Sequence, residues 1–175
     1  MIGSVFVTLQ TAAQVLRVPP FRIIHLCEEG CVTPVENSAG RGSVRRFDRD
    51  NLLELAVCLE LQNAGIPAPR ILHCIKVFHR LRRMKAVKPL ITERGLFGAV
   101  ESLGTRETPA MLHVKVPERG TSPTEPMLVV IQSERYPPSS PDSGFGFIAD
   151  PSLVNAWPVR VSLNLTYISS TIGLR

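Results

Sequence analysis

Apolar residues recur in the first part of the chain at the three- and four-residue spacing of amphipathic helices. After a short extended entry at 5–8, the first such run has its apolar positions at Leu9, Ala12, Ala13 and Leu16. Thr8 is the expected N-cap, with Thr11 as a second candidate, because a threonine hydroxyl accepts a hydrogen bond from a backbone N–H of the first turn. The pattern predicts a first helix that ends at Val18-Pro19-Pro20.

A second short helix is predicted directly after this break, because proline is well placed to open a helix. Its apolar face has Ile23, Ile24, Leu26 and Cys27. Gly30 is expected to end it, as a glycine just beyond a helix does. Two short helices joined by a turn of three or four residues predict a helix-turn-helix.

A loop and two further helices are predicted next. Residues 31–42 are mostly loop, and 43–47 pairs back as a small β-ribbon. Asp48 is the N-cap of a third helix from about Arg49 to Ala64, which Gly65 ends. One face of that helix carries Leu52, Leu55, Ala56 and Leu59. A fourth helix opens at Pro67 and Pro69, and its inward positions are Ile71, Leu72, Ile75 and Phe78.

The pattern changes after Pro89, where short apolar runs alternate with proline-rich turns. Strand-like runs lie at 111–116, 127–132, 145–148 and 159–165. Residues 163–172 are compatible with a strand or with a helix. The expected fold class is therefore α+β, with one domain at 1–88 and a small β-rich domain at 89–175.

The charge divides the chain at the same place. Residues 1–88 carry 13 Lys and Arg against 7 Asp and Glu, whereas residues 89–175 carry 7 against 8. The first half therefore has a net charge of +6 and the second half −1. A basic first half is compatible with a polyanionic partner, and the asymmetry predicts two parts with different tasks.

Other features of the composition exclude several classes of protein. No run approaches the roughly 18 apolar residues of a membrane span, and the apolar start is too short for a signal peptide, which predicts a cytoplasmic protein. The four cysteines form neither a CxxC pair nor a zinc-site spacing. They are expected to be reduced, partly buried thiols, and neither a metal nor a cofactor is expected.

The turn from Arg41 to Asp50 is the strongest candidate for a binding site. Arg41, Arg45 and Arg46 lie in a turn with glycine and serine, directly before the predicted N-cap Asp48. A basic, glycine-containing turn that leads into a helix suits contact with a phosphate backbone.

The order of these elements resembles the DNA-binding domain of the MerR family of bacterial regulators over about residues 7–78. Residues 8–18 resemble its first helix and turn, and residues 20–30 its recognition helix. Val44-Arg45-Arg46-Phe47-Asp48 resembles its Tyr-Arg-Arg-Tyr-Ser wing motif, and Ala64-Gly65-Ile66 its Leu-Gly-Phe. The order and spacing of these motifs make the resemblance specific.

Within the helix-turn-helix, the chain departs from the family pattern at two places. Ile24, His25 and Leu26 stand where the family has an arginine and an aromatic pair. The family's glycine in the first turn is missing from Leu16-Arg17-Val18.

The resemblance implies a regulator that binds double-stranded DNA, with the second helix in the major groove. Arg22 then reads guanine or holds a phosphate, or else is a solvated surface arginine. His25 is a base contact or an ordinary half-exposed residue. The wing residues Arg45 and Arg46 contact phosphate or the minor groove, and two further backbone contacts are Arg41 and Arg49. A homodimer is expected, because one short helix contacts few bases.

Two other classes remain open from the sequence: a protein-interaction module that reuses the winged helix, and an architectural DNA binder of the phage excisionase type. The second half has no nucleotide-binding loop or catalytic set, so no enzyme is expected. Residues 89–175 are left with three tasks: sensing a small-molecule or protein effector, contacting a partner, or forming the dimer.

Overall fold

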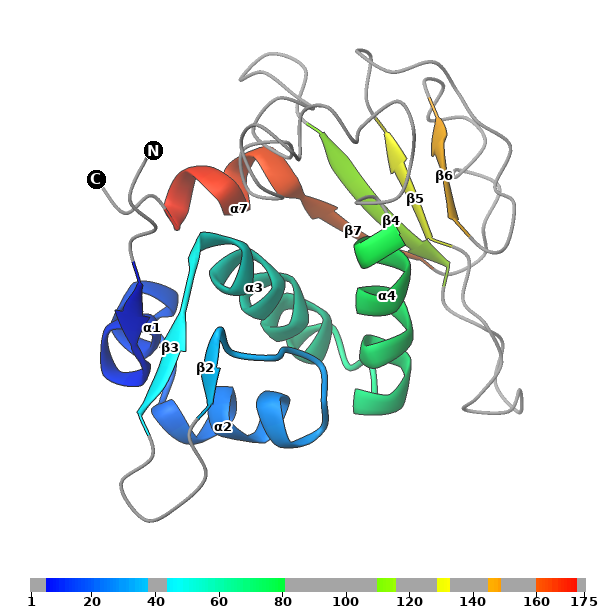
Figure 1. Ribbon diagram of the computed structural model, residues 1–175. Coiled ribbons are helices and arrows are strands. Elements are labelled where there is room, and N and C mark those ends of the chain that lie inside the picture. Colours follow the sequence, from blue (N-terminus) through cyan, green and yellow to red (C-terminus); the bar gives the residue numbers. More distant parts are fainter. Residues whose placement is uncertain are drawn as a thin grey trace.

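The computed structural model describes residues 6–37, 44–80, 110–115, 129–132, 145–148 and 160–172. Within these ranges the chain is an α+β protein (Figure 1). The helices are α1 (Leu9–Leu16), α2 (Pro20–Glu28), α3 (Arg49–Asn63), α4 (Ala68–Arg80) and α7 (Leu165–Thr171). The strands are β1 (Val7–Thr8), β2 (Glu36–Asn37), β3 (Arg45–Phe47), β4 (Met111–Lys115), β5 (Val129–Gln132), β6 (Phe145–Ile148) and β7 (Arg160–Asn164).

Helix α1 begins where the sequence predicts. The Thr8 hydroxyl accepts a hydrogen bond from the Thr11 backbone N–H at 3.3 Å, so Thr8 is the N-cap. At the other end Arg17 adopts φ 54°, the left-handed region that favours glycine. Its N–H bonds to the Gln14 carbonyl at 3.2 Å, and the Val18 N–H bonds to the Ala13 carbonyl at 3.0 Å. The chain therefore closes α1 with a left-handed arginine.

Helix α2 also has the predicted ends. Pro19 is the N-cap residue and Pro20 the first helical residue. At the C-terminus Gly30 adopts φ 73°. Its N–H bonds to the Cys27 carbonyl at 3.1 Å, and the following Cys31 N–H bonds to the Leu26 carbonyl at 2.9 Å. These bonds satisfy carbonyls that the end of a helix leaves open.

The first sheet has the strand order β1-β3-β2, with both pairs antiparallel. The predicted pairing of 43–47 is confirmed for Arg45 and Arg46, which pair with β2, and for Phe47, which pairs with β1. Residues 31–42 were expected to be mostly loop, and within the described part of that segment the structure adds the two-residue strand β2. Val7 lies opposite Phe47, and Glu36 lies opposite Arg46. The sheet therefore joins the start of α1 to the strand that leads into α3.

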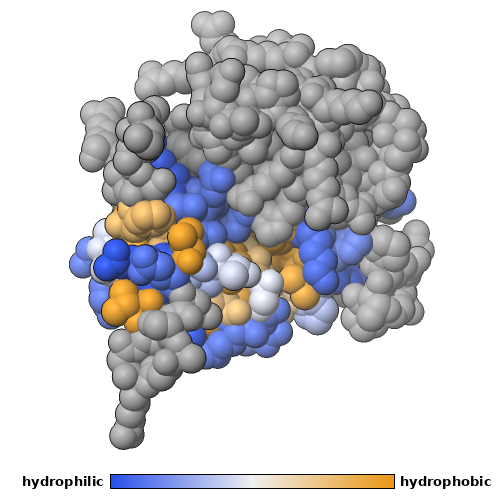
Figure 2. All heavy atoms as spheres, in the orientation of Figure 1, coloured by the Kyte–Doolittle hydropathy of each residue, from blue (hydrophilic) through white to orange (hydrophobic). Residues whose placement is uncertain are grey.

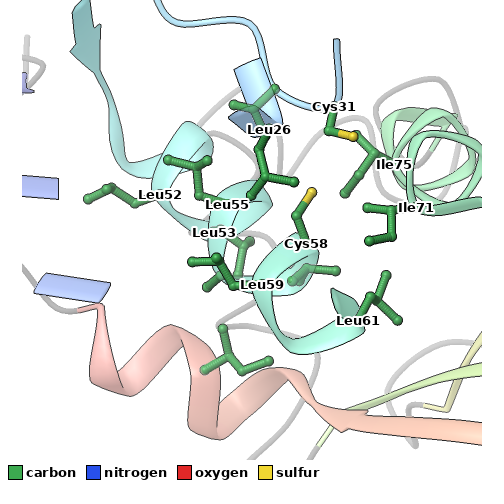
Figure 3. Close-up of a cluster of buried hydrophobic side chains, with 14 of the residues drawn as sticks. Leu26, Cys31, Leu52, Leu53, Leu55, Cys58, Leu59, Leu61, Ile71 and Ile75 are labelled. Carbon is green, nitrogen blue, oxygen red and sulfur yellow. The ribbon is translucent and has the colours of Figure 1, made fainter. Parts of the chain in front are cut away.

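Helix α3 is the centre of the fold, as Figures 1 and 3 show. The Asp48 carboxylate accepts a hydrogen bond from the Asn51 N–H at 2.7 Å, which confirms the predicted N-cap. The four residues predicted for the apolar face are buried, and the burial extends to every residue from Asn51 to Leu59. Helices α1 and α2 pack on one side of α3, α4 on another, and α7 with β7 on a third. A helix enclosed on all sides needs no polar face.

Helix α4 follows Gly65, which adopts φ 80°. Ile71 and Ile75 are buried as predicted, and Leu72 is half-buried. The side chain of Phe78 lies outside the described part of the structure. In Figure 3, Ile71 and Ile75 of α4 lie beside Cys58 and Leu61 of α3.

The second sheet has the strand order β6-β5-β4-β7. Strands β4–β5 and β4–β7 pair antiparallel, whereas β5–β6 pair parallel. All four runs that the sequence marked as strand-like contain a strand of this sheet. The segment 163–172 is partly strand and partly helix, because β7 ends at Asn164 and α7 begins at Leu165. The Asn164 side chain caps α7 by accepting a hydrogen bond from the Tyr167 N–H at 2.8 Å.

The hydrophobic core continues from the helices into this sheet. Leu112 and Val114 of β4, and Leu165 and Ile168 of α7, belong to the same buried cluster as the α3 leucines. The predicted domain boundary at 88/89 lies outside the described residues. The core nevertheless links the two parts of the chain, because α7 packs directly on α3.

Removing the cap of α3 should lower stability by a defined amount. We expect Asp48→Ala to reduce the free energy of unfolding by about 1 kcal/mol, because an N–H of the first turn loses its acceptor. Asp48→Asn should cost much less, since an amide oxygen can accept the same bond. Urea unfolding of both variants checks this, and equal losses for the two would contradict the capping role.

Candidate functional site

The candidate site is the surface formed by α2 and the β2–β3 pair. Exposed residues of this surface on α2 are Phe21, His25 and Glu28, with Glu29 directly after the helix. Phe21 is 67% exposed, and the His25 ring nitrogen lies 4.0 Å from the Glu29 carboxylate. In Figure 2, hydrophilic and hydrophobic residues are interspersed on the described part of the face it shows.

Arg22 does not extend freely from α2. One guanidinium nitrogen donates to the side-chain oxygens of Gln62 at 3.0 Å and Asn63 at 3.1 Å. Both acceptors lie at the C-terminal end of α3. Arg22, which the resemblance assigned to contact with guanine or phosphate, is therefore held against α3. Its guanidinium donates hydrogen bonds to two neutral amide oxygens.

The wing arginines lie on strand β3 and differ in exposure. Successive residues of a strand point to opposite faces, so Arg45 and Arg46 have different surroundings. The Arg45 side chain is 19% exposed, and its guanidinium lies 3.9 Å from the Glu28 carboxylate of α2. The Arg46 side chain is 49% exposed and lies 3.2 Å from the Glu36 carboxylate of β2. Arg46 is therefore the more accessible of the two.

Arg49 and Arg41 are the two other predicted backbone contacts. Arg49 is exposed at the first position of α3. Arg41 lies outside the described residues. The structure thus joins Arg45 to α2 and Arg46 to β2, whereas Arg22 turns toward α3.

Sequence reasoning missed the acidic partners Glu28 and Glu36. Each arginine is far from its glutamate along the chain, and only the strand register puts Glu36 opposite Arg46. One sequence signal points to the Glu36–Arg46 pair: the two segments of the short ribbon carry opposite charges, and opposite charges favour facing positions on paired strands. The surface is therefore of mixed charge, with arginines and glutamates as neighbours.

The four cysteines lie on or next to helices α2, α3 and α4. All four thiols are free; Cys27 is half-buried, and Cys31, Cys58 and Cys74 are buried. Burial raises the pKa of the Cys27 thiol to about 11 and that of Cys74 to about 12. A side-chain hydrogen bond between Cys31 and Cys58 lowers the pKa of the Cys31 thiol and raises that of the Cys58 thiol. Figure 3 shows the Cys58 side chain pointing to the side of α3 where Cys31 lies.

The described residues contain no cluster of three or more His, Cys, Asp or Glu side chains that could hold a metal ion. None of the described helices has both the length and the apolar character needed to cross a membrane.

No protein-family model matches the chain, and no curated protein matches it with significant similarity.

The raised thiol pKa values predict a loss of stability at alkaline pH. A thiol whose pKa is higher in the folded than in the unfolded protein favours folding below its unfolded pKa of about 9, and this contribution is lost as the pH rises toward the folded value. The free energy of unfolding should therefore fall between about pH 9 and 12. The free energy of unfolding of Cys74→Ala, although lower at pH 7, should fall less steeply as the pH rises. Parallel pH profiles in urea unfolding would contradict the assignment.

Proposed function

We propose that this chain binds double-stranded DNA, with α2 in the major groove and the β2–β3 wing on the phosphate backbone. The observation that carries the proposal is that the exposed helix α2 lies beside the wing strand β3, where the Arg45 guanidinium is 3.9 Å from the Glu28 carboxylate. A helix and a basic ribbon held on the same side of a domain suit simultaneous contact with a groove and its flanking phosphates. The resemblance to the MerR DNA-binding domain supports the same arrangement.

The side chains offered to a groove are Phe21 in the first turn of α2 and His25 in its last turn, both of which are exposed. Phe21 presents an apolar ring, suited to the methyl group of thymine. His25 presents an imidazole ring, whose nitrogens suit hydrogen bonds to base edges. Arg22, anchored on α3, fits the role of orienting α2 better than that of reading a base.

The ion pairs on the wing do not prevent contact with DNA. An exposed pair such as Arg46–Glu36 contributes about 0–1 kcal/mol, so exchanging the carboxylate for a phosphate costs little. Phosphate contact also releases condensed counterions, which favours binding at moderate salt. We further propose a homodimer that places two copies of α2 on two half-sites, because a single short helix contacts too few bases for specificity.

The acidic residues favour a second candidate, a protein-interaction module. Glu28 and Glu36 are more than half exposed, and Glu29 is 44% exposed. Together with the exposed Phe21 they resemble the polar rim and aromatic anchor of a protein interface. The two candidates respond oppositely to removal of an acidic charge.

Binding to a random pool of duplex DNA tests the first candidate. We expect the full-length protein to enrich a defined, palindromic site. Arg46→Ala should weaken binding to that site about 3- to 30-fold and reduce the slope against salt by about one unit, because one phosphate contact is lost. Lys76→Ala, which removes the same charge from an exposed position of α4, is the matched control and should change little. If no duplex is enriched, or if both variants behave alike, the DNA proposal fails.

Removal of the carboxylate opposite Arg46 separates the two candidates. Glu36→Gln should raise affinity for the enriched duplex about 2- to 10-fold, since it frees Arg46 and removes repulsion of phosphate. Glu60→Gln, an equal change of charge at an exposed position of α3, is the control. Fluorescence anisotropy measures both. Unchanged or weaker binding by Glu36→Gln alone would favour the protein-interaction module.

A further inference from the structure

A pocket lies between the α1–α2 turn, α3, and the segment of β7 and α7. Its volume is about 600 Å³, which is within the range of small-molecule sites. Apolar lining comes from both parts of the chain and includes Leu16, Val18, Leu59, Leu163 and Ile168. The pocket therefore joins the helices of the candidate DNA-binding surface to the C-terminal helix.

The charge of the pocket comes from two arginines and one glutamate. Arg17 and Arg22 both line it, as does Glu60. Arg22 is bound to two neutral amide oxygens, and no carboxylate is recorded within ion-pair distance of Arg17 or Arg22 in the described part of the chain. The lining therefore carries a net charge of +1.

The polar groups that α7 contributes are partly engaged within the chain. The Asn164 side chain accepts from the Tyr167 N–H at 2.8 Å, and the Thr171 hydroxyl donates to the Ile168 carbonyl at 2.8 Å. Tyr167 also lines the pocket and is 66% exposed, so its ring is available to cover a ligand. For a ligand the pocket thus offers the Arg17 guanidinium, the Arg22 guanidinium nitrogens other than the one bound to Gln62 and Asn63, an aromatic ring and an apolar wall.

We propose that this pocket binds a small organic acid with one carboxylate and an apolar body. The carboxylate would lie on Arg17 and Arg22, whose planar guanidinium groups donate paired hydrogen bonds to carboxylates. The apolar body would pack on Leu163 and Ile168. A single negative charge is favoured over a phosphate dianion because Glu60 lowers the net charge of the lining to +1.

Such a ligand would contact the turn that sets the direction of α2. Arg17 lies at the left-handed position that ends α1, and Val18 leads into Pro19 and α2. Occupancy would therefore favour one placement of α2 relative to α7. This regulatory consequence rests on the proposed function, whereas binding of the acid does not.

The binding test uses octanoate and phenylacetate as probes, with octanol and octylamine as uncharged and cationic controls. Methyl NMR spectra of the full-length protein report on Leu16, Val18, Leu163 and Ile168. We expect at least one carboxylate to shift these methyl resonances saturably at millimolar concentration or below, and the two controls to bind at least fivefold more weakly. The proposal is overturned if neither carboxylate shifts them, or if octanol binds as tightly.

Two variants test the role of the arginines. Arg17→Gly removes one guanidinium from a position whose φ of 54° favours glycine, so the fold should be retained, and binding of the carboxylate should weaken at least fivefold. Arg22→Gln should weaken it similarly. Lys76→Ala, away from the pocket, should bind normally. If Arg17→Gly and Arg22→Gln both bind the carboxylate as the wild type does, the assignment of the arginines fails. No step uses DNA, so a negative result here leaves the DNA proposal to its own test.

Discussion

The enclosure of α3 is the constraint on which the rest of the structure depends. Every residue from Asn51 to Leu59 is buried, and the surrounding elements come from both ends of the chain. Each fully buried leucine stabilises the fold by about 1.5–3 kcal/mol, whereas an exposed ion pair contributes about 0–1 kcal/mol. The positions of α2, β3 and α7 are therefore set by their packing on α3, and the charged pairs at the surface are secondary.

Because packing on α3 contributes more than the surface ion pairs do, the candidate surface can be ordered while its charged side chains stay available to a binding partner. Packing holds α2 and β3 in place, so Arg46 can exchange Glu36 for another anion without loss of the fold. Arg22 has a structural role instead, because its hydrogen bonds to Gln62 and Asn63 link α2 to the end of α3. The same anchoring places Arg22 in the wall of the pocket, next to the turn that separates α1 from α2.

Local features were predictable from the sequence and non-local ones were not. Thr8 and Asp48 cap helices by bonds to residues three positions away, and Gly30 and Gly65 end helices through their own backbone conformation. Such effects are visible in a short window. Burial on all sides of α3 depends on α7, which is about 100 residues distant, so the leucine pattern alone indicated one face. The pairing of Arg46 with Glu36 required the strand register, and the direction of Arg22 required the packing of α2 on α3.

Amide NMR can test the proposed contact of α2 and the wing with DNA most directly. The protein is titrated with a duplex that it enriches, and shifts are assigned along the chain. DNA contact through α2 and the wing should give the largest shifts at the N-terminal half of α2 and at Arg45–Phe47, with small shifts at Met111–Lys115 and Arg160–Asn164. Shifts concentrated on β4 and β7, with α2 and β3 unchanged, would contradict it.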